Sequence, residues 1–86
     1  MQPGRKITVL YFAAVRELAG VSEETLELSA EVRTVEDLRR LLDQRHPEFV
    51  GRLLRVRFCI NEQFVQLDAQ LSNGDVVGLI PPVAGG

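Results

Sequence analysis

The spacing of apolar residues in the first third of the chain predicts two strands. Residues 7–12 are rich in branched and aromatic side chains, which is typical of a buried strand. Residues 24–28 alternate between polar and apolar, so we expect Leu26 and Leu28 to face a core. The two segments predict an antiparallel hairpin, and its long connection has room for a short helical turn over residues 14–18.

The clearest helix begins at Thr34. Its hydroxyl can accept a hydrogen bond from the N–H of Asp37, and the Asp37 carboxylate stands where a capping box places an acid. Pro47 prevents the helix from continuing. Residues 48–54 carry no clear pattern and are compatible with a short helix. The apolar side chains that follow the cap at helical spacing are Val35, Leu38, Leu41 and Leu42.

The second half of the chain predicts a run of short strands. Residues 56–60 read as a strong strand, residues 64–65 as a short one and residues 76–80 as the last. Residues 72–75, with the sequence Ser-Asn-Gly-Asp, predict a tight turn before the last strand. Pro81 marks the point where backbone hydrogen bonding by that strand ends.

This order of elements predicts a two-layer α+β domain over residues 1–80. A mixed sheet of four to five strands should pack on one main helix. A right-handed crossover through the helix places the first and last strands side by side and parallel. This is the β-grasp arrangement of ubiquitin. Residues 81–86 should extend from it as a tail.

Composition narrows the possible functions. Eighty-six residues suffice for one domain with a small core. The net charge of −2 lacks the basic excess of nucleic-acid-binding proteins, so nucleic acid is not an expected partner. The single cysteine excludes an intrachain disulfide and fits a reducing compartment. One cysteine and one histidine cannot build a usual zinc site, so we expect no metal.

The N-terminal apolar run superficially resembles a signal peptide, because two basic residues precede residues 7–15. The run is short, Thr8 interrupts it, and Arg16 follows its end. Its removal would also delete the best strand of a small domain. We interpret it as a strand of a cytoplasmic protein. No segment approaches the ~20 apolar residues of a membrane span.

The tail carries the most specific chemistry. Pro81 and Pro82 stiffen the exit, whereas Gly85 and Gly86 have no Cβ and can pass through a narrow channel. Fully extended, the tail reaches roughly 20 Å. The pattern indicates that the terminal carboxylate of Gly86 is held out for an enzyme to modify. The alternative is an ordinary frayed end.

Several stretches of the chain resemble the small subunits of molybdopterin synthase. The ending is the most specific of them, because an Asn-Gly-Asp turn is followed at fixed spacing by Pro-Pro-Val-Ala-Gly-Gly. Gly78 is a small departure, since a bulkier residue would be usual inside the last strand. The stretches that carry the resemblance are residues 9–20, 34–38, 60–61, 71–77 and 80–86.

The resemblance implies that this chain carries sulfur and that its partners supply all catalysis. An adenylyltransferase related to ubiquitin-activating enzymes would join the Gly86 carboxylate to AMP, using ATP and magnesium. A sulfur donor protein would then convert the adenylate to a thiocarboxylate. The loaded tail would give its sulfur to cyclic pyranopterin monophosphate in a large catalytic subunit, which forms the dithiolene of molybdopterin. The chain itself is expected to bind no cofactor.

The resemblance also implies a complex of two small and two large subunits. Docking should bury an apolar patch near the last strand, containing Val83 and either Leu79 or Ile80. One of Tyr11 and Phe12 should face the core and the other an interface. The tail residues that would enter the large subunit are Pro81, Pro82, Val83, Ala84 and Gly85.

Two other functions fit the same pattern. A sulfur carrier or ubiquitin-like modifier of another pathway, such as thiamin or cysteine synthesis or tRNA thiolation, would share the tail chemistry and differ in its acceptor. A ubiquitin-like binding module without tail chemistry would make Gly85 and Gly86 dispensable.

The other reactive side chains favour structural roles. Cys59 lies between apolar neighbours in a strand, which favours core packing over a sulfur relay. His46 stands at a helix end, which favours a cap or a solvent-facing position over catalysis. Arg52, Arg55 and Arg57 could form a patch for an acidic partner, but strand alternation favours a solvated face.

Overall fold

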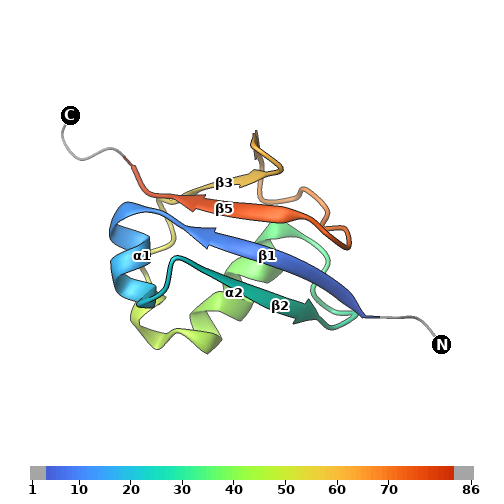
Figure 1. The fold of residues 1–86 in the computed structure, drawn as a ribbon, viewed down its shortest axis with the longest axis horizontal. Helices are drawn as coiled ribbons and strands as arrows, with labels where there is room; N and C mark the ends of the chain where they lie inside the picture. Colours follow the sequence, from blue (N-terminus) through green and yellow to red (C-terminus); the bar gives the residue numbers. More distant parts are fainter. Residues whose placement is uncertain (1–3, 83–86) are drawn as a thin grey trace.

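The structure is a computed structural model that describes residues 4–82 of the chain. Five strands form one mixed sheet in the order β2-β1-β5-β3-β4. The strands are β1 (Arg5–Tyr11), β2 (Glu23–Leu28), β3 (Arg57–Ile60), β4 (Gln63–Val65) and β5 (Val76–Ile80). The helices are α1 (Ala13–Ala19), α2 (Val35–Arg45) and the short 3₁₀ helix η1 (Pro47–Phe49). Figure 1 shows α2 packed across one face of the sheet, so the predicted α+β fold is confirmed.

The centre of the sheet joins the two ends of the chain. β1 runs antiparallel to β2 and parallel to β5, with Thr8 opposite Val76 and Tyr11 opposite Leu79. β3 pairs antiparallel with both β5 and β4. The parallel pairing of the first and last strands agrees with the expected crossover. Because β5 is a central strand, the chain leaves it at Pro81 from the middle of the sheet rather than from an edge.

The start of α2 follows local capping chemistry. The hydroxyl of Thr34 accepts a hydrogen bond from the N–H of Asp37, whose carboxylate accepts from the N–H groups of Arg33 and Thr34. These backbone hydrogen bonds hold the pKa of the Asp37 carboxyl below its usual range. The helix ends at His46, as predicted, and its buried residues are Val35, Leu38 and Leu42.

The core lies between α2 and the inner face of the sheet. Tyr11 is 2% exposed there, whereas Phe12 is 44% exposed. Tyr11 is therefore the core residue of the pair, and Phe12 is the exposed one. The segment 48–54 adds Phe49 and Leu53, both buried, and η1 is its short helical turn. A segment without sequence periodicity therefore supplies two core side chains.

Tight turns complete the sheet. Gly20 ends α1 with φ of 79°, and Gly74 in the turn before β5 has φ of 89°. Asn61 and Glu62 both have positive φ, as a two-residue type I′ hairpin turn between β3 and β4 requires. Within residues 4–82, no helix is long and apolar enough to cross a bilayer.

Candidate functional site

The face of the sheet opposite α2 carries an apolar depression of about 580 Å³, here called the outer hollow. Alternate residues of β1, β3, β4 and β5 point to this face. Two of them, Phe64 and Val76, are large apolar residues left exposed, and so is Phe12, which directly follows β1. Three exposed apolar side chains around one hollow make this face a candidate interaction surface. The apolar residues that line the hollow are Leu10, Phe12, Cys59, Phe64, Val76, Gly78 and Ile80.

Gly78 lies at the base of the outer hollow. A Cβ at this position would lie 2.8 Å from Sγ of Cys59 and 3.3 Å from Cε2 of Phe12. Gly78 is itself buried beneath these neighbours. The glycine that departs from the expected pattern is therefore explained by packing, because the two side chains occupy the space that its own side chain would need.

The prediction that Cys59 packs in the core was wrong. Cys59 is half-buried and lines the outer hollow, whereas its neighbour Phe58 is 2% exposed in the core. Consecutive strand residues point to opposite faces, so Cys59 shares the face of Arg57. Its thiol therefore lies where a docking protein would cover it.

Side-chain hydrogen bonds close one end of the outer hollow. Oδ1 of Asn61 accepts from the N–H of Val76 at 3.0 Å, and its Nδ2 donates to Oδ1 of Asp75 at 3.1 Å. Oδ2 of Asp75 accepts from the N–H of Ser72 at 2.8 Å. These bonds tie the β3–β4 turn to the turn before β5. The opposite end of the hollow lies at Ile80, directly before the tail.

The tail leaves the domain beside a second depression, the exit groove, of about 440 Å³. Pro81 is half-buried and Pro82 is exposed. Apart from these two prolines, the groove is lined by α1 and the segment before β3, through Ala14, Val15, Leu18, Gly51, Arg52, Leu54, Arg55 and Val56.

Leu79 is fully buried in the core, so it cannot join a docking patch, and Ile80 is the member of that predicted pair that lines the outer hollow. Val83, Ala84, Gly85 and Gly86 lie outside the described residues. The predicted chemistry of the Gly86 carboxylate therefore stays a prediction.

The three arginines near the exit are exposed: strand alternation accounts for Arg57, whereas Arg52 and Arg55 lie in the loop before β3. Arg52 and Arg55 line the exit groove. Arg57 stands opposite Ile80 in the sheet, and its guanidinium carbon lies 4.1 Å from the centroid of the Phe64 ring. Arg57 therefore lies at the margin between the outer hollow and the tail exit.

A polar cluster on the inner side of the sheet joins β1, β2 and the end of α2. Oε2 of Glu24 accepts a hydrogen bond from the Tyr11 hydroxyl at 2.9 Å and lies 2.7 Å from Nε2 of His46. Arg45 approaches the other Glu24 oxygen at 3.5 Å. Burial, and then the hydrogen bond to Glu24, raise the pKa of the Tyr11 hydroxyl. Burial also acts to raise the pKa of the Glu24 carboxyl, but the hydrogen bonds from His46 and Tyr11 outweigh it and lower that pKa.

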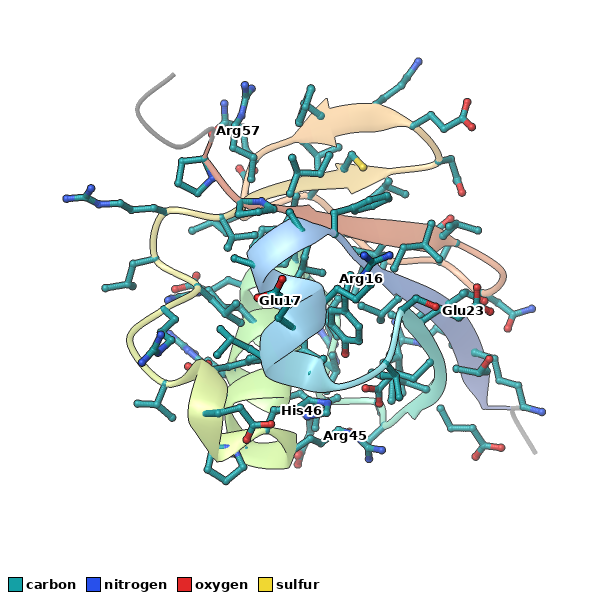
Figure 2. The ribbon with its side chains drawn as sticks, turned by 60° about the vertical axis from the view of Figure 1, so that its left-hand side comes forward. Arg16, Glu17, Glu23, Arg45, His46 and Arg57 are labelled. Carbon is teal, nitrogen blue, oxygen red and sulfur yellow. The ribbon has the colours of Figure 1, made fainter. Side chains whose placement is uncertain are left out.

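His46 has the capping role that was one of its two expected roles, and its side chain is packed against the fold rather than facing solvent. Its backbone N–H bonds to the Leu42 carbonyl and caps α2 as expected, but its side chain is only 16% exposed. The ring packs against Phe49 with 4.7 Å between centroids. Figure 2 shows His46 and Arg45 at the end of the molecule away from Arg57.

This cluster belongs to the fold and is separate from both depressions. Neither Tyr11 nor Glu24 nor His46 lines the outer hollow or the exit groove. Sequence reasoning missed the role of Glu24, whose partners are far away in the chain. Among residues 4–82, no group of three histidine, cysteine or acidic side chains is placed to hold a metal ion.

Comparison with known proteins identifies the family. Residues 9–86 match the model of the ThiS family. The chain belongs to the ThiS family. Relatives of this ThiS-family chain include a Chlamydomonas reinhardtii protein, 41% identical over 94% of this chain and 99% of the relative, and a human protein, 33% identical over the full length of both. Both relatives are named molybdopterin synthase sulfur carrier subunit.

Solved structures share the same fold as this ThiS-family chain. A Pyrococcus furiosus protein assigned as subunit 1 of molybdopterin converting factor matches with a TM-score of 0.81 and 39% identity, over 92% of this chain and 99% of that one. SAMP1 of Haloferax volcanii matches with 0.82 and 25%, over 94% and 99%. A complex of subunits 1 and 2 of the Helicobacter pylori molybdopterin-converting factor matches with 0.64 and 27%, over 94% and 99%.

Proposed function

We propose that this ThiS-family chain is the sulfur carrier subunit of a molybdopterin synthase. Relatives of that name align over nearly their whole length. The structural observation that carries the proposal is the outer hollow, which follows β5 as far as Ile80, the residue before Pro81 and Pro82. A protein docked on the hollow therefore receives the tail at a fixed position.

The chemistry of the proposal uses the tail carboxylate. A carboxylate is a poor electrophile until it gains a leaving group. The Gly86 carboxylate attacks the α-phosphate of ATP, pyrophosphate leaves, and a sulfur nucleophile then displaces AMP to give the thiocarboxylate. Both this displacement and the later transfer pass through a tetrahedral centre that the partner must stabilise. Glycine does not crowd that centre, because it has no side chain.

The partners follow from this chemistry. The Helicobacter pylori structure holds subunits 1 and 2 together, which supports a large-subunit partner for this chain. We place the cyclic pyranopterin substrate and the catalytic groups in that subunit, in a cytoplasmic complex of two small and two large subunits. A ubiquitin-activating-enzyme-like adenylyltransferase, using ATP and magnesium, and a sulfur donor protein load the tail.

Docking on the outer hollow supplies the affinity that holds the tail in place. Phe12 and Phe64 are 44% and 54% exposed, and complete burial of such a side chain contributes about 1.5–3 kcal/mol. A few apolar anchors of this kind dominate most interfaces. The extended tail adds main-chain hydrogen bonds in its channel.

Loading of the tail is the direct test. The chain is incubated with its cognate activating enzyme, ATP, magnesium and a sulfur donor, and its intact mass is measured. We expect the gain that corresponds to exchange of one oxygen for sulfur at Gly86. An unchanged mass, under conditions that load a known carrier, would falsify the proposal.

Substitution of the tail tests whether it is threaded into a channel. Gly85→Val adds a branched side chain to the tail and should abolish product formation while the melting temperature stays unchanged. Gly4→Val is the matched control, because Gly4 directly precedes β1 and, among the described residues, only Glu27 lies within 4 Å of its Cβ position. Normal product formation by Gly85→Val would refute the threading.

Cys59 provides a reporter of docking because it is the single cysteine and lines the outer hollow. The large subunit should slow alkylation of Cys59 by N-ethylmaleimide in the carboxylate form of the chain. Cys59→Ala should still transfer sulfur, since the thiol takes no part in the chemistry. Equal alkylation rates with and without the large subunit would exclude the hollow as the docking site.

A protein modifier is the alternative function. It is supported by the structure of Haloferax volcanii SAMP1, small archaeal modifier protein 1, which matches with a TM-score of 0.82. A modifier would form an amide between Gly86 and lysine side chains of other proteins. Mass spectrometry of the host proteome distinguishes the two, because tryptic cleavage after Arg57 would leave residues 58–86 of a modifier joined to lysine, and a pure sulfur carrier leaves no such adduct. A sulfur carrier of another pathway would load normally and fail to convert cyclic pyranopterin monophosphate.

A further inference from the structure

Most arginines of the described region stabilise the fold. Arg5 donates to backbone carbonyls, Arg40 pairs with Glu36, and Arg45 pairs with Glu24. Arg16 on α1 and the arginines around the tail exit differ. Among residues 4–82, no side-chain hydrogen bond or ion pair involves the guanidinium groups of Arg52, Arg55 and Arg57.

These three arginines surround the point where the tail leaves the domain. Arg52 and Arg55 line the exit groove together with Pro82. Arg57 stands opposite Ile80, the last residue of β5. Three positive charges are thus gathered within six residues of a chain whose net charge is −2. The local concentration of charge needs a separate explanation, because the composition of the chain does not produce it.

Arg57 is also held in place before any partner arrives. Its guanidinium lies 4.1 Å from the centroid of the Phe64 ring, within the range of a cation–π contact. The stack already restricts the Arg57 side chain, so less rotamer freedom remains to be lost when a partner binds. It also attaches a charge to the rim of the outer hollow, because Phe64 lines that hollow.

We propose that Arg52, Arg55 and Arg57 form a cationic collar that contacts aspartate and glutamate side chains around the mouth of the partner's tail channel. The inference rests on the proposed function. It adds that the partner presents negatively charged side chains around its tail channel. The collar adjoins both the outer hollow and the tail exit, so a protein that covers the hollow and takes the tail must place its surface over these arginines. A carboxylate rim matches three guanidinium groups in charge and in hydrogen-bond geometry.

The chain's own terminal carboxylate is the weaker occupant of the collar. Residues 83–86 are long enough to fold back, at ~3.3 Å per residue. Ordering them opposes the contact by about 1–2 kcal/mol per residue. An exposed ion pair returns only about 0–1 kcal/mol. A partner's carboxylates do not require residues 83–86 to be ordered against the arginines. The comparison of the ordering cost with the ion-pair energy therefore favours the partner's carboxylates.

Exposed interfacial charges act mainly on the rate of association. Complementary fields raise on-rates by about 10–1,000-fold, and the effect falls steeply with ionic strength. The collar should therefore steer the tail toward its channel. After docking, the apolar contacts in the outer hollow determine how long the complex lasts.

The test measures association of the full chain with its cognate large subunit, from about 0.01 M to about 1 M salt, where the Debye length falls from ~30 Å to ~3 Å. The double variant Arg55→Gln/Arg57→Gln should associate roughly tenfold more slowly at low salt. Its association rate should also depend less on salt, and its dissociation rate should change little. Arg40→Gln is the matched control, since it removes an exposed arginine from α2, and it should leave the rates unchanged.

Arg57→Lys separates charge from stacking. It keeps the charge and weakens the stacking on Phe64, so the association rate should be retained and the dissociation rate should change little, as in the double variant. An association rate that falls as far as in the double variant would overturn the steering explanation.

The remaining outcomes are also decisive. An unchanged salt dependence in the double variant would overturn the collar and leave the proposed function standing, because binding itself would persist. Faster association of the double variant would show that the chain's own carboxylate occupies the arginines, which also overturns the inference. Complete absence of binding by the wild-type chain would remove the proposed partner and the collar together.

Discussion

The inner and outer faces of one sheet use similar side chains for different purposes. On β1, Tyr11 is 2% exposed, whereas Phe12, which directly follows the strand, is 44% exposed. On the β3–β4 hairpin, Phe58 is 2% exposed and Phe64 is 54% exposed. The inner face stabilises the domain, and the outer face presents apolar surface that the domain does not need. The comparison teaches that the direction of a strand side chain, and not its type, determines what it contributes.

Phe58 and Phe64 offer the sharpest way to break this comparison, because they are the same residue on neighbouring strands. Phe58→Ala should lower the free energy of unfolding by about 3–5 kcal/mol, since it leaves a cavity in the core. Phe64→Ala should lower it by only about 0.5–1 kcal/mol, mainly through loss of the Arg57 stack. Urea unfolding measures both values.

The affinity for the large subunit should rank the two substitutions in the reverse order. Phe64→Ala should weaken association with the large subunit by about 2 kcal/mol, the size of an interface anchor. Titration of the large subunit measures it. Equal losses of stability in the two alanine variants would show that the faces do not differ as described.

Gly78 and Cys59 test how tightly the outer face is packed. Gly78→Ala should destabilise the domain by about 1–3 kcal/mol, because its Cβ would lie 2.8 Å from Sγ of Cys59. Cys59→Ala alone should lower stability by less than about 1 kcal/mol, since the side chain is only half-buried. In the double variant most of the Gly78→Ala penalty should disappear, because the contact with Sγ is gone. Additive losses in this double-mutant cycle would place the clash at Phe12 instead.

The smallest expected effect concerns the polar cluster of the inner face. The pKa of the Glu24 carboxyl is lowered in the folded chain, so Glu24 stabilises the fold above its ordinary pKa of about 4.5. That stabilisation is lost as the pH falls through the lowered pKa of the folded state. The urea midpoint of the wild-type chain should therefore drop on acidification below about pH 4.5, and that of Glu24→Gln should drop less steeply.

Glu27→Gln is the matched control for this measurement, because Glu27 is an exposed acid on the same strand. It should leave the wild-type pH dependence in place. A Glu24→Gln variant with the same pH dependence as the wild-type chain would show that the cluster is not coupled to folding.

The elements that the sequence predicted well are those with local causes. The cap at Thr34 and Asp37 fixes the start of α2 by chemistry within four residues. Alternation over residues 24–28 placed Leu26 and Leu28 in the core, as the structure confirms. The segment 48–54 could not be assigned, because Phe49 and Leu53 are buried by contacts with distant elements rather than by any period.

The candidate site divides in the same way. The tail can be recognised directly from the amino-acid sequence. The chemistry of its Gly86 carboxylate stays a prediction. The outer hollow could not be derived without the strand order, since four strands line it. The cluster around Glu24 needed His46 and Tyr11 to meet across the fold. Cys59 was different, because the alternation that placed Arg57 on the outer face already placed Cys59 there as well.

The position of β5 between β1 and β3 has a consequence for the life of the chain in the cell. Before β5 is in place, the remaining strands form only two local hairpins, β1–β2 and β3–β4, and an isolated hairpin is at best marginally stable in water. β5 follows the other elements in the chain, and its pairing with β1 joins residues far apart in the sequence, the kind of contact that slows folding. The same strand builds the docking face and leads into Pro81. Under the proposed function, a partner that recognises the outer hollow together with the tail would therefore accept only chains that have finished folding.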